Sequence, residues 1–392
     1  MKTDSNGRSQ WNQTYGGGED DEAYALLQTT DGGYILAGRT GSFGTGGYDY
    51  WLVKTDSHGI PQWDRTYGGA KNDSAWALIQ TTDGGYALTG ETDSYGARDL
   101  DWWLVKTDSQ GILQWNRTYG GRDDDSAHAL IQTPDGGYAL GGWTGSFGAG
   151  WSDFWLVKTD RQGIPQWNRT YGGGDYDYAR ALIQTPDGGY ALAGWTKSYG
   201  AGDYDYWLVK TDSNGTIQWN QTYGGVRSNY ARALIQTPDG GYALVGTTTP
   251  SGAGSIDSWL VKTDGNGIPQ WDRRYGGVGY DSAYALIQTP DGGYALGGWT
   301  TGYSAGDYDF WLVKTKILVT DYYWSDTFTK TEGMVFPITV FSYLAIVVTG
   351  SSVGLLTSRL VYRRYKKWRQ KKATSKGLRE EVNNRVGRIP TK

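Results

Sequence analysis

Residues 167–220 read WNRTYGGGDYDYARALIQTPDGGYALAGWTKSYGAGDYDYWLVKTDSNGTIQWN, and nearly the same text occurs six times along the chain. The tryptophan of its QW step recurs every 52 residues, and so does the tryptophan of WLVK. The two sets are Trp11, Trp63, Trp115, Trp167, Trp219 and Trp271, and Trp51, Trp103, Trp155, Trp207, Trp259 and Trp311. A fixed period of this size indicates a repeat architecture in which each copy packs on its neighbours.

Within each copy, four short segments alternate with turns. In the first full copy they span residues 23–29, 34–40, 49–56 and 61–67. TDGG, or TPDGG in the last four copies, joins the first two, and a Ser-x-Gly turn joins the last two, so each pair is expected to be a β-hairpin. Four strands in a unit of about 50 residues, six times over, predict an all-β, six-bladed β-propeller over residues 1–316.

The phase of the repeat bears on how such a ring closes. The chain starts near the fourth strand of a copy, and its last copy ends on the third strand at residues 311–314. We therefore expect the N-terminal strand around Trp11 to complete the last blade without a free edge. Met1 aligns with Val53, and a second hypothesis is that an upstream part with a signal peptide and further strands is missing. Seven blades would then be the better count.

Composition excludes several kinds of site. The 392 residues include no cysteine, which rules out disulfides and thiolate metal ligands. From Arg359 onward there are 13 basic and 2 acidic residues, a net charge of +11, and the remainder has 24 basic and 39 acidic residues, a net charge of −15. Such an acidic body does not attract nucleic acid. His58 and His128 lack a nucleophile elbow, and no catalytic set or cofactor is expected.

A hydrophobic segment follows the repeats. After a connector at residues 317–332, residues 333–358 carry no charge over 26 positions. As a helix they would be about 39 Å long, which crosses a hydrocarbon core of about 30 Å with some tilt. The basic run from Arg359 predicts that residues 359–392 are a cytoplasmic tail and that the propeller is extracellular. Gly350 and Gly354 would allow a weak dimer of transmembrane helices.

The repeat also resembles a known pattern. W-x-x-TYGG, A-x-ALIQTPDGGY and D-x-WLVKTD-x-x-G resemble the DGGY/LVKTD repeats of β-propellers in archaeal and bacterial surface proteins, which sit with the quinoprotein-like, tryptophan-docking propellers. The resemblance covers residues 1–316 and implies a surface propeller without carrying over a catalytic residue. It also implies that an Asp, a Gly and a Trp dock one blade on the next. The matching residues are Asp56, Gly59 and Trp63, and Asp212, Gly215 and Trp219.

Because every blade solves the same packing problem, a binding site is expected where the copies differ. Two positions vary most, between the alanines of the first strand and after the glycine of the second. They carry Tyr24, Trp76, His128, Arg180, Arg232 and Tyr284, and Arg39, Glu91, Trp143, Trp195, Thr247 and Trp299. Trp102 and Trp151 add aromatic rings that we expect in the loop before the third strand. Such rings, mixed with carboxylates and guanidinium groups, suit a sugar or a polar peptide. Surface-loop residues under little constraint are the alternative.

Two further patterns concern metals and glycans. Acidic residues cluster at Asp99 and Asp101, Asp203 and Asp205, Asp307 and Asp309, and at Asp124, Asp125, Asp175 and Asp177. They could hold Ca²⁺, but a solvated acidic rim is the preferred interpretation and no metal site is expected. Candidate glycosylation sites lie on the fourth strands at Asn12, Asn116, Asn168 and Asn220, and elsewhere at Asn72 and Asn214.

These observations predict a single-pass membrane protein that displays a propeller at the cell surface. The favoured function is binding or adhesion to a glycan or a surface partner, and no enzyme activity is expected. A structural protein of the cell envelope without a specific ligand is the alternative. An enzyme of the quinoprotein or glycan-processing kind ranks third.

Overall fold

The computed structural model describes residues 1–4, 8–249, 256–303 and 307–315, all within one compact unit, Met1–Leu318. The secondary structure of these residues consists of β-strands. Within them, no helix has the length and apolar character needed to cross a membrane. The predicted connector at 317–332, transmembrane helix at 333–358 and tail at 359–392 lie outside the described residues.

Six antiparallel sheets follow one another in chain order, and they confirm the predicted six-bladed β-propeller. Blade 1 consists of β3 (Asp21–Gln28), β4 (Tyr34–Thr40), β5 (Asp49–Thr55) and β6 (Pro61–Tyr67). Blade 2 consists of β7 (Asp73–Gln80), β8 (Tyr86–Thr92), β9 (Asp101–Thr107) and β10 (Leu113–Tyr119). Blade 3 consists of β11 (Asp125–Gln132), β12 (Tyr138–Thr144), β13 (Asp153–Thr159) and β14 (Pro165–Tyr171).

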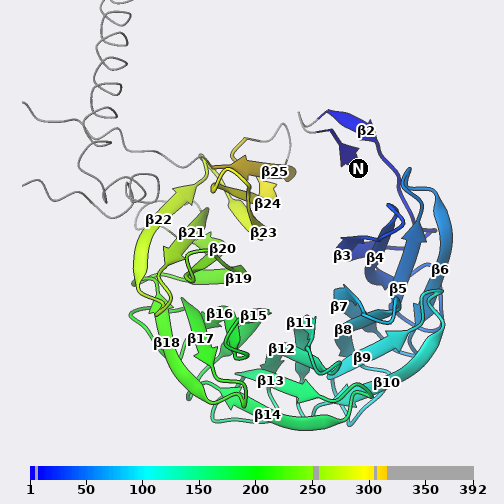
Figure 1. Ribbon diagram of the computed structural model, residues 1–392, viewed down its shortest axis with the longest axis horizontal. Coiled ribbons are helices and arrows are strands. Elements are labelled where there is room, and N and C mark those ends of the chain that lie inside the picture. The colour runs from blue at the N-terminus through cyan, green and yellow to red at the C-terminus, as the bar shows by residue number, and fades with distance from the viewer. Residues whose placement is uncertain (5–7, 250–255, 304–306, 316–392) are drawn as a thin grey trace, which may run out of the picture. The chain divides into compact units, whose positions relative to one another are not determined.

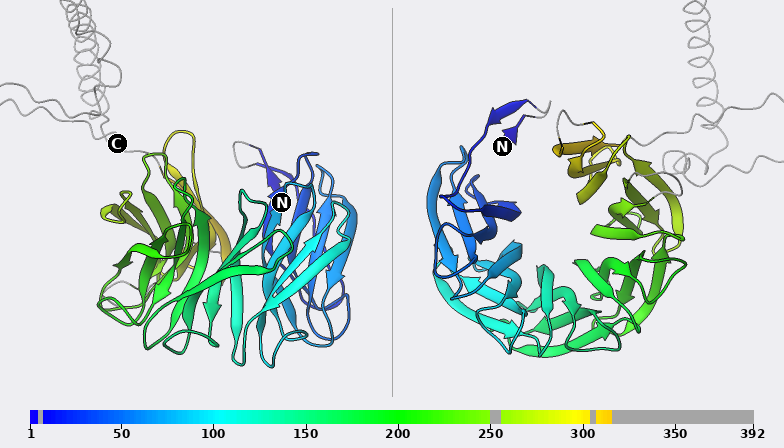
Figure 2. Two further views of the ribbon diagram at one scale, coloured as in Figure 1. Left: turned by 60° about the horizontal axis from the view of Figure 1, so that its bottom comes forward. Right: turned by 180° about the vertical axis from the view of Figure 1, so that it is seen from behind.

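The remaining blades repeat this pattern. Blade 4 consists of β15 (Asp177–Gln184), β16 (Tyr190–Thr196), β17 (Asp205–Thr211) and β18 (Ile217–Tyr223). Blade 5 consists of β19 (Asn229–Gln236), β20 (Tyr242–Thr248), β21 (Asp257–Thr263) and β22 (Pro269–Tyr275). Blade 6 has three strands, β23 (Asp281–Gln288), β24 (Tyr294–Thr300) and β25 (Asp309–Lys314). Figure 1 shows the blades around a ring, with the first strand of each innermost, and the view from behind in Figure 2 shows the same order.

The predicted closure of the ring by the N-terminal strand is wrong. β2 (Ser9–Trp11) pairs with β1 (Lys2–Thr3) and not with β25. Lys2 faces Trp11 in β1–β2, just as Lys54 faces Trp63 in blade 1. The N-terminal residues therefore reproduce the end of a third strand and the start of a fourth strand in the register of the repeat. A local hairpin of this kind closes a loop of a few residues, and that costs less entropy than pairing with a strand about 300 residues away.

A tryptophan and a tyrosine of each outer strand dock on the next blade, as the resemblance implied for Trp63 and its equivalents. A methyl group built on Gly111, which turns between β9 and β10 with a φ of +73°, would lie 2.6 Å from Cζ3 of Trp63. The indole therefore packs on a bare α-carbon. The Tyr67 hydroxyl donates a 2.6 Å hydrogen bond to the carbonyl of the same glycine. Trp11 and Tyr15 make the corresponding contacts with Gly59 of blade 1.

Aromatic residues of the third strands fill the space between blades. Trp102 of blade 2 packs on Trp155 of blade 3 with ring centroids 4.5 Å apart, and Phe154 of blade 3 packs on Trp207 of blade 4 at 4.6 Å. Trp102 is fully buried in β9, so the prediction that it is a loop aromatic is wrong. Its position is equivalent to that of Phe154, which packs in the same way, and it belongs to the core. Each such ring removes about 150–250 Å² from water.

Candidate ligand-binding site at the inner strands

Each inner strand carries a β-bulge at the variable position. In β3, Ala23 pairs with Gly38 and Ala25 pairs with Ala37, which leaves Tyr24 between them without a partner. The same interruption occurs in the other five blades at Trp76, His128, Arg180, Arg232 and Tyr284. A bulge bends the strand and redirects its side chain. We call these six the inner-strand residues.

The glycine opposite the bulge is required by the bulged backbone. A methyl group on Gly38 would lie 1.8 Å from the carbonyl oxygen of Glu22. The equivalent distances are 1.9 Å for Gly90 and 2.2 Å for Gly142. Glycine recurs at this place in the second strand because the bulged backbone comes too close for any side chain.

The six inner-strand residues form a continuous chain of contacts across all six blades. The ring centroids of Tyr24 and Trp76 are 4.3 Å apart, and those of Trp76 and His128 are 5.6 Å apart. Nη1 of Arg180 lies 2.7 Å from Nε2 of His128. The chain then continues through Trp195 to Arg232, whose guanidinium carbon lies 5.1 Å from the ring centroid of Tyr284.

Trp195 joins this chain to a row of rings that leads outward. Trp195 is 6% exposed, and its ring centroid is 5.6 Å from that of Tyr178. Tyr178 lies parallel to Tyr176 at 6.1 Å, and Tyr176 stacks on Trp151 at 6.1 Å. Trp151 is 69% exposed. We call Trp195, Tyr178, Tyr176 and Trp151 the aromatic ladder, because it connects the inner strands with the loop surface.

The acidic and basic groups of the site divide into paired and unpaired ones. Arg39 forms a 2.8 Å ion pair with Glu22, and its guanidinium carbon lies 4.3 Å from the ring centroid of Tyr48. Burial raises the pKa of Glu91, against the effect of the hydrogen bond from Ser126. The Ser126 hydroxyl donates to Glu91 Oε2 at 2.5 Å. These two carboxylates therefore have partners within the site.

Arg180 and Arg232 are different. Burial, followed by the positive charge of Arg232, lowers the pKa of Arg180 to about 10. Burial and the two guanidinium groups lower the pKa of His128 well below its usual value, so His128 is neutral at pH 7. The Nε atoms of both arginines, like that of Arg39, are buried and have no hydrogen-bond partner, but among these three described residues only Arg39 is in an ion pair. The site thus has positive charge at its centre, although the protein body is acidic.

The structure places most of the predicted site residues together. The inner-strand residues and Trp195 are in contact, Arg39 lies within 6.0 Å of Tyr24, and Glu91 reaches His128 through Ser126. Trp143 packs edge-on against Tyr178 with ring centroids 5.1 Å apart. Trp299 does not join them. Its ring packs on Tyr308 in blade 6, with centroids 4.8 Å apart.

Sequence reasoning missed a third variable position, two residues before the bulge. Glu22 pairs with Arg39, and Tyr178 pairs with Trp195. Ser126, which bridges Glu91 and His128, is the equivalent residue of blade 3. The period-two alternation of a strand puts residues i and i+2 on one face. That rule, applied from each inner-strand residue, would have found this set.

The prediction of a solvated acidic rim is wrong for four of the clustered aspartates, which are buried: Asp101, Asp125, Asp177 and Asp205. Asp101 is buried, and its carboxylate accepts a hydrogen bond from the backbone of Ala97, while Asp205 accepts one from Ala201 at 2.8 Å. Among the described residues, no group of three or more His, Asp or Glu side chains could hold a metal ion. Asn116, Asn168 and Asn220 are exposed, and each accepts a hydrogen bond from a third-strand tryptophan at 3.2 or 3.3 Å. Their glycosylation stays a prediction, as does that of Asn12.

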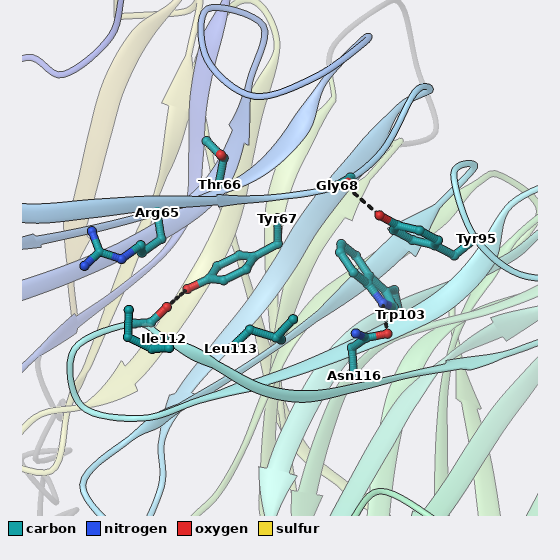
Figure 3. Close-up of a pocket in the computed structure, with 10 residues that line it drawn as sticks. Arg65, Thr66, Tyr67, Gly68, Tyr95, Trp103, Ile112, Leu113 and Asn116 are labelled. Carbon is teal, nitrogen blue, oxygen red and sulfur yellow. Dashed lines mark hydrogen bonds between the residues drawn. The ribbon is translucent and has the colours of Figure 1, made fainter.

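A surface pocket of about 410 Å³ lies on the outer seam between blades 1 and 2 (Figure 3). The Tyr95 hydroxyl donates to the carbonyl of Gly68 at 2.6 Å, and Nε1 of Trp103 donates to Asn116 at 3.2 Å. Equivalent bonds occur at later seams, for example from Tyr199 to Gly172. Because its residues repeat from blade to blade, this pocket is part of the docking of blades.

Comparisons with known proteins add little. No family model matches the chain, and no curated protein matches it. Among solved structures it is similar to Sqt1 from Chaetomium thermophilum, at 15% identity over 72% of this chain and 67% of that one, with a TM-score of 0.43. The Pan2 WD40 domain of Neurospora crassa has 10% identity over 70% and 85%, with a TM-score of 0.40. Puromycin hydrolase has 14% identity over 71% and 44%, with a TM-score of 0.43. Similarity at this level assigns neither a ligand nor an activity.

Proposed function

We propose that this protein is a binding module that holds a glycan or a surface partner at the inner-strand residues. One observation carries the proposal. The residues that change from copy to copy are the ones that contact each other across the blades, whereas the constant residues dock the blades. If the changes were free drift at exposed loops, they would not concentrate at a bulge that lies in the innermost strand of every blade.

The chemistry of the site suits a sugar. The aromatic ladder offers flat ring faces on which the C–H groups of a sugar ring can pack, and its outer end is accessible at Trp151, which is 69% exposed. At its inner end Trp195 contacts Arg180, which leads on to the hydrogen-bonded set of His128, Ser126 and Glu91. Apolar faces with a few fixed polar groups are the usual composition of a small-ligand site.

The cellular setting is part of the proposal. The uncharged segment 333–358, followed by the basic run from Arg359, supports a single-pass anchor with the propeller outside the cell. The DGGY/LVKTD resemblance supports the same location. Membrane fractionation of the full chain and of a chain that lacks residues 333–358 tests this part. Recovery of both in the soluble fraction would refute the anchor.

A glycan panel tests the binding function. We expect the full chain to bind a subset of surface glycans, and we expect Trp151→Ala and Tyr284→Ala each to weaken that binding by about tenfold or more, as removal of an anchoring aromatic ring does. Phe147→Ala is the matched control, because Phe147 lies in the same loop as Trp151 and packs on Trp155 instead. Binding that is absent, or that is insensitive to both variants, would favour the structural role in the cell envelope.

A further inference from the structure

Two guanidinium groups lie close together in the site, and neither is in an ion pair with a described side chain. The guanidinium carbons of Arg180 and Arg232 lie 4.9 and 4.8 Å from the ring centroid of Trp195. Among the described residues neither forms an ion pair, whereas Arg39 has Glu22 at 2.8 Å. Partly buried like charges repel each other, and burial removes the water that would screen them. A group that brings negative charge between them removes this cost.

The neighbouring side chains supply only part of that charge, because Glu91 attracts Arg180 without forming an ion pair with it. A guanidinium group can only donate hydrogen bonds, so the 2.8 Å contact of Arg180 Nη1 with Nδ1 of His128 requires a neutral imidazole that accepts there. Nε2 then donates to the Ser126 hydroxyl, whose own proton goes to Glu91. The carboxylate of Glu91 accepts from Ser126 and lies beyond ion-pair distance of both arginines. The buried, unpartnered Nε atoms of Arg180 and Arg232 are therefore donors for which the described part of the chain provides no acceptor.

The orientation of the arginines favours a carboxylate. Both guanidinium groups lie over the faces of aromatic rings, Trp195 for both and Tyr284 for Arg232. Contacts through the face leave the N–H edges free for hydrogen bonds other than the one from Arg180 to His128, and two parallel N–H groups match the planar geometry of a carboxylate. The aromatic ladder starts at the same tryptophan and leads outward to the exposed ring of Trp151, so it can take the sugar units that follow that carboxylate.

We propose that the ligand is an acidic glycan, in which the carboxylate of one sugar binds between Arg180 and Arg232 and the adjoining sugars pack along the aromatic ladder. This inference rests on the proposed function. An acidic peptide would supply carboxylates but no flat sugar face for Tyr178, Tyr176 and Trp151. The net charge of −15 on the body opposes dense polyanions, so separated acid groups on a mainly neutral glycan fit better than a highly charged polymer.

Titration calorimetry with the full chain tests the proposal. The probes are aldotriouronic acid, a trisaccharide with one carboxylate, and its methyl ester, which has the same rings without the charge. We expect the acid to bind at least about tenfold more tightly than the ester, because the charged hydrogen bonds are lost in the ester. Arg180→Gln and Arg232→Gln should each abolish this preference. Arg169→Gln, which removes a guanidinium that lies over the outer-strand Trp167 ring, should retain it.

The outcomes separate this inference from the function on which it rests. Equal affinity for acid and ester would refute the proposed carboxylate contact with the arginines, and so would a preference that survives in Arg180→Gln and Arg232→Gln. Both results leave glycan binding itself intact. No binding of either probe also refutes that contact, and the glycan panel then decides the proposed function on its own. If a glutamate-rich peptide competes as strongly as aldotriouronic acid, the proposal that the ligand is a glycan is wrong. Thermal unfolding of each variant, matched to the unchanged chain, shows that a lost preference is not a lost fold.

Discussion

The first three strands of blade 4 and the three strands of blade 6 have nearly the same residues but bury them differently. Leu208 of β17 is 0% exposed and Leu312, at the same place in β25, is 75% exposed. Tyr206 and Phe310 differ in the same way, at 0% and 99%. In blade 4 the ring of Tyr206 packs on Trp259 of the next blade. The comparison teaches that these apolar side chains are buried by the neighbouring blade rather than by their own sheet.

Blade 1, at the other end of the row of blades, also shows that burial depends on a neighbouring blade, in this case the one before it. Leu26 on the inner strand of blade 1 is 60% exposed, whereas Leu182, its equivalent in blade 4, is 6% exposed. Blade 1 lacks a complete sheet before it, since β1 and β2 supply two short strands. A blade therefore depends for its stability on both neighbours, as expected for a repeat protein.

The largest effect is expected when the equivalent leucine of each blade is replaced by alanine. We expect Leu208→Ala to lower the free energy of unfolding by about 2–5 kcal/mol, because it leaves a cavity in a packed interface. Leu312→Ala should cost less than about 0.5 kcal/mol, the usual size of a surface change. Urea unfolding followed by tryptophan fluorescence measures both. Equal losses would mean that β25 is covered in solution, and the contrast between the blades would fail.

A smaller effect is expected from the tyrosines that dock one blade on the next. The Tyr171 hydroxyl is buried and donates to the carbonyl of Gly215 at 2.7 Å, whereas that of Tyr15 makes the same bond to Gly59 in a less buried place. Tyr171→Phe leaves a buried carbonyl without a donor and should cost about 1–2 kcal/mol. Tyr15→Phe should cost less than half as much, since water can replace the hydroxyl. The same unfolding assay ranks the two, and the reverse order would contradict the comparison.

The smallest effect concerns acid sensitivity. Burial alone would raise the pKa of Asp187, but hydrogen bonds from Lys210 and Thr185 lower it to about 2. The stability that this pair contributes is complete above the unfolded-state pKa of about 3.9 and is lost as the pH falls through 2. Lys210→Met should therefore reduce the loss of stability between pH 4 and pH 2. Lys314 also lowers the pKa of its partner Asp291 in blade 6. Lys314→Met should still change the pH dependence less, because solvent screens the 43% exposed Lys314 more than the 6% exposed Lys210. Thermal unfolding across this pH range checks the difference, and identical pH profiles would contradict it.

Much of the fold followed from the period of the sequence and its turn residues. The predicted strands at 34–40 and 61–67 match β4 and β6, because Gly and Pro mark their ends. The first strand begins two residues earlier than predicted, at Asp21, whose carboxylate accepts a hydrogen bond from the backbone of Gly17 and holds the preceding loop. Closure was not predictable from the pattern, since Lys2 and Trp11 can form a local pair that competes with the distant β25.

The site was predictable in its positions but not in its geometry. Variation between copies identified His128, Arg180 and Trp195, which the structure joins. Variation between copies did not predict that Trp299 is separated from them, because Trp299 packs on Tyr308 within blade 6. Gly38 and its equivalents are the sequence signal for the bulge, but a glycine within a strand has several possible causes. Only the structure shows that the cause here is the close approach of the Glu22 carbonyl.

The bulge has a consequence for how this scaffold can change. Tyr24 and its five equivalents have no partner in the strand ladder, so a substitution there alters the proposed ligand surface without shifting the register that the other residues share. A library randomised at these six positions would sample new binding surfaces while keeping the strand pairing that defines each blade. Evolution by copying repeats and laboratory selection would thus act on the same six codons.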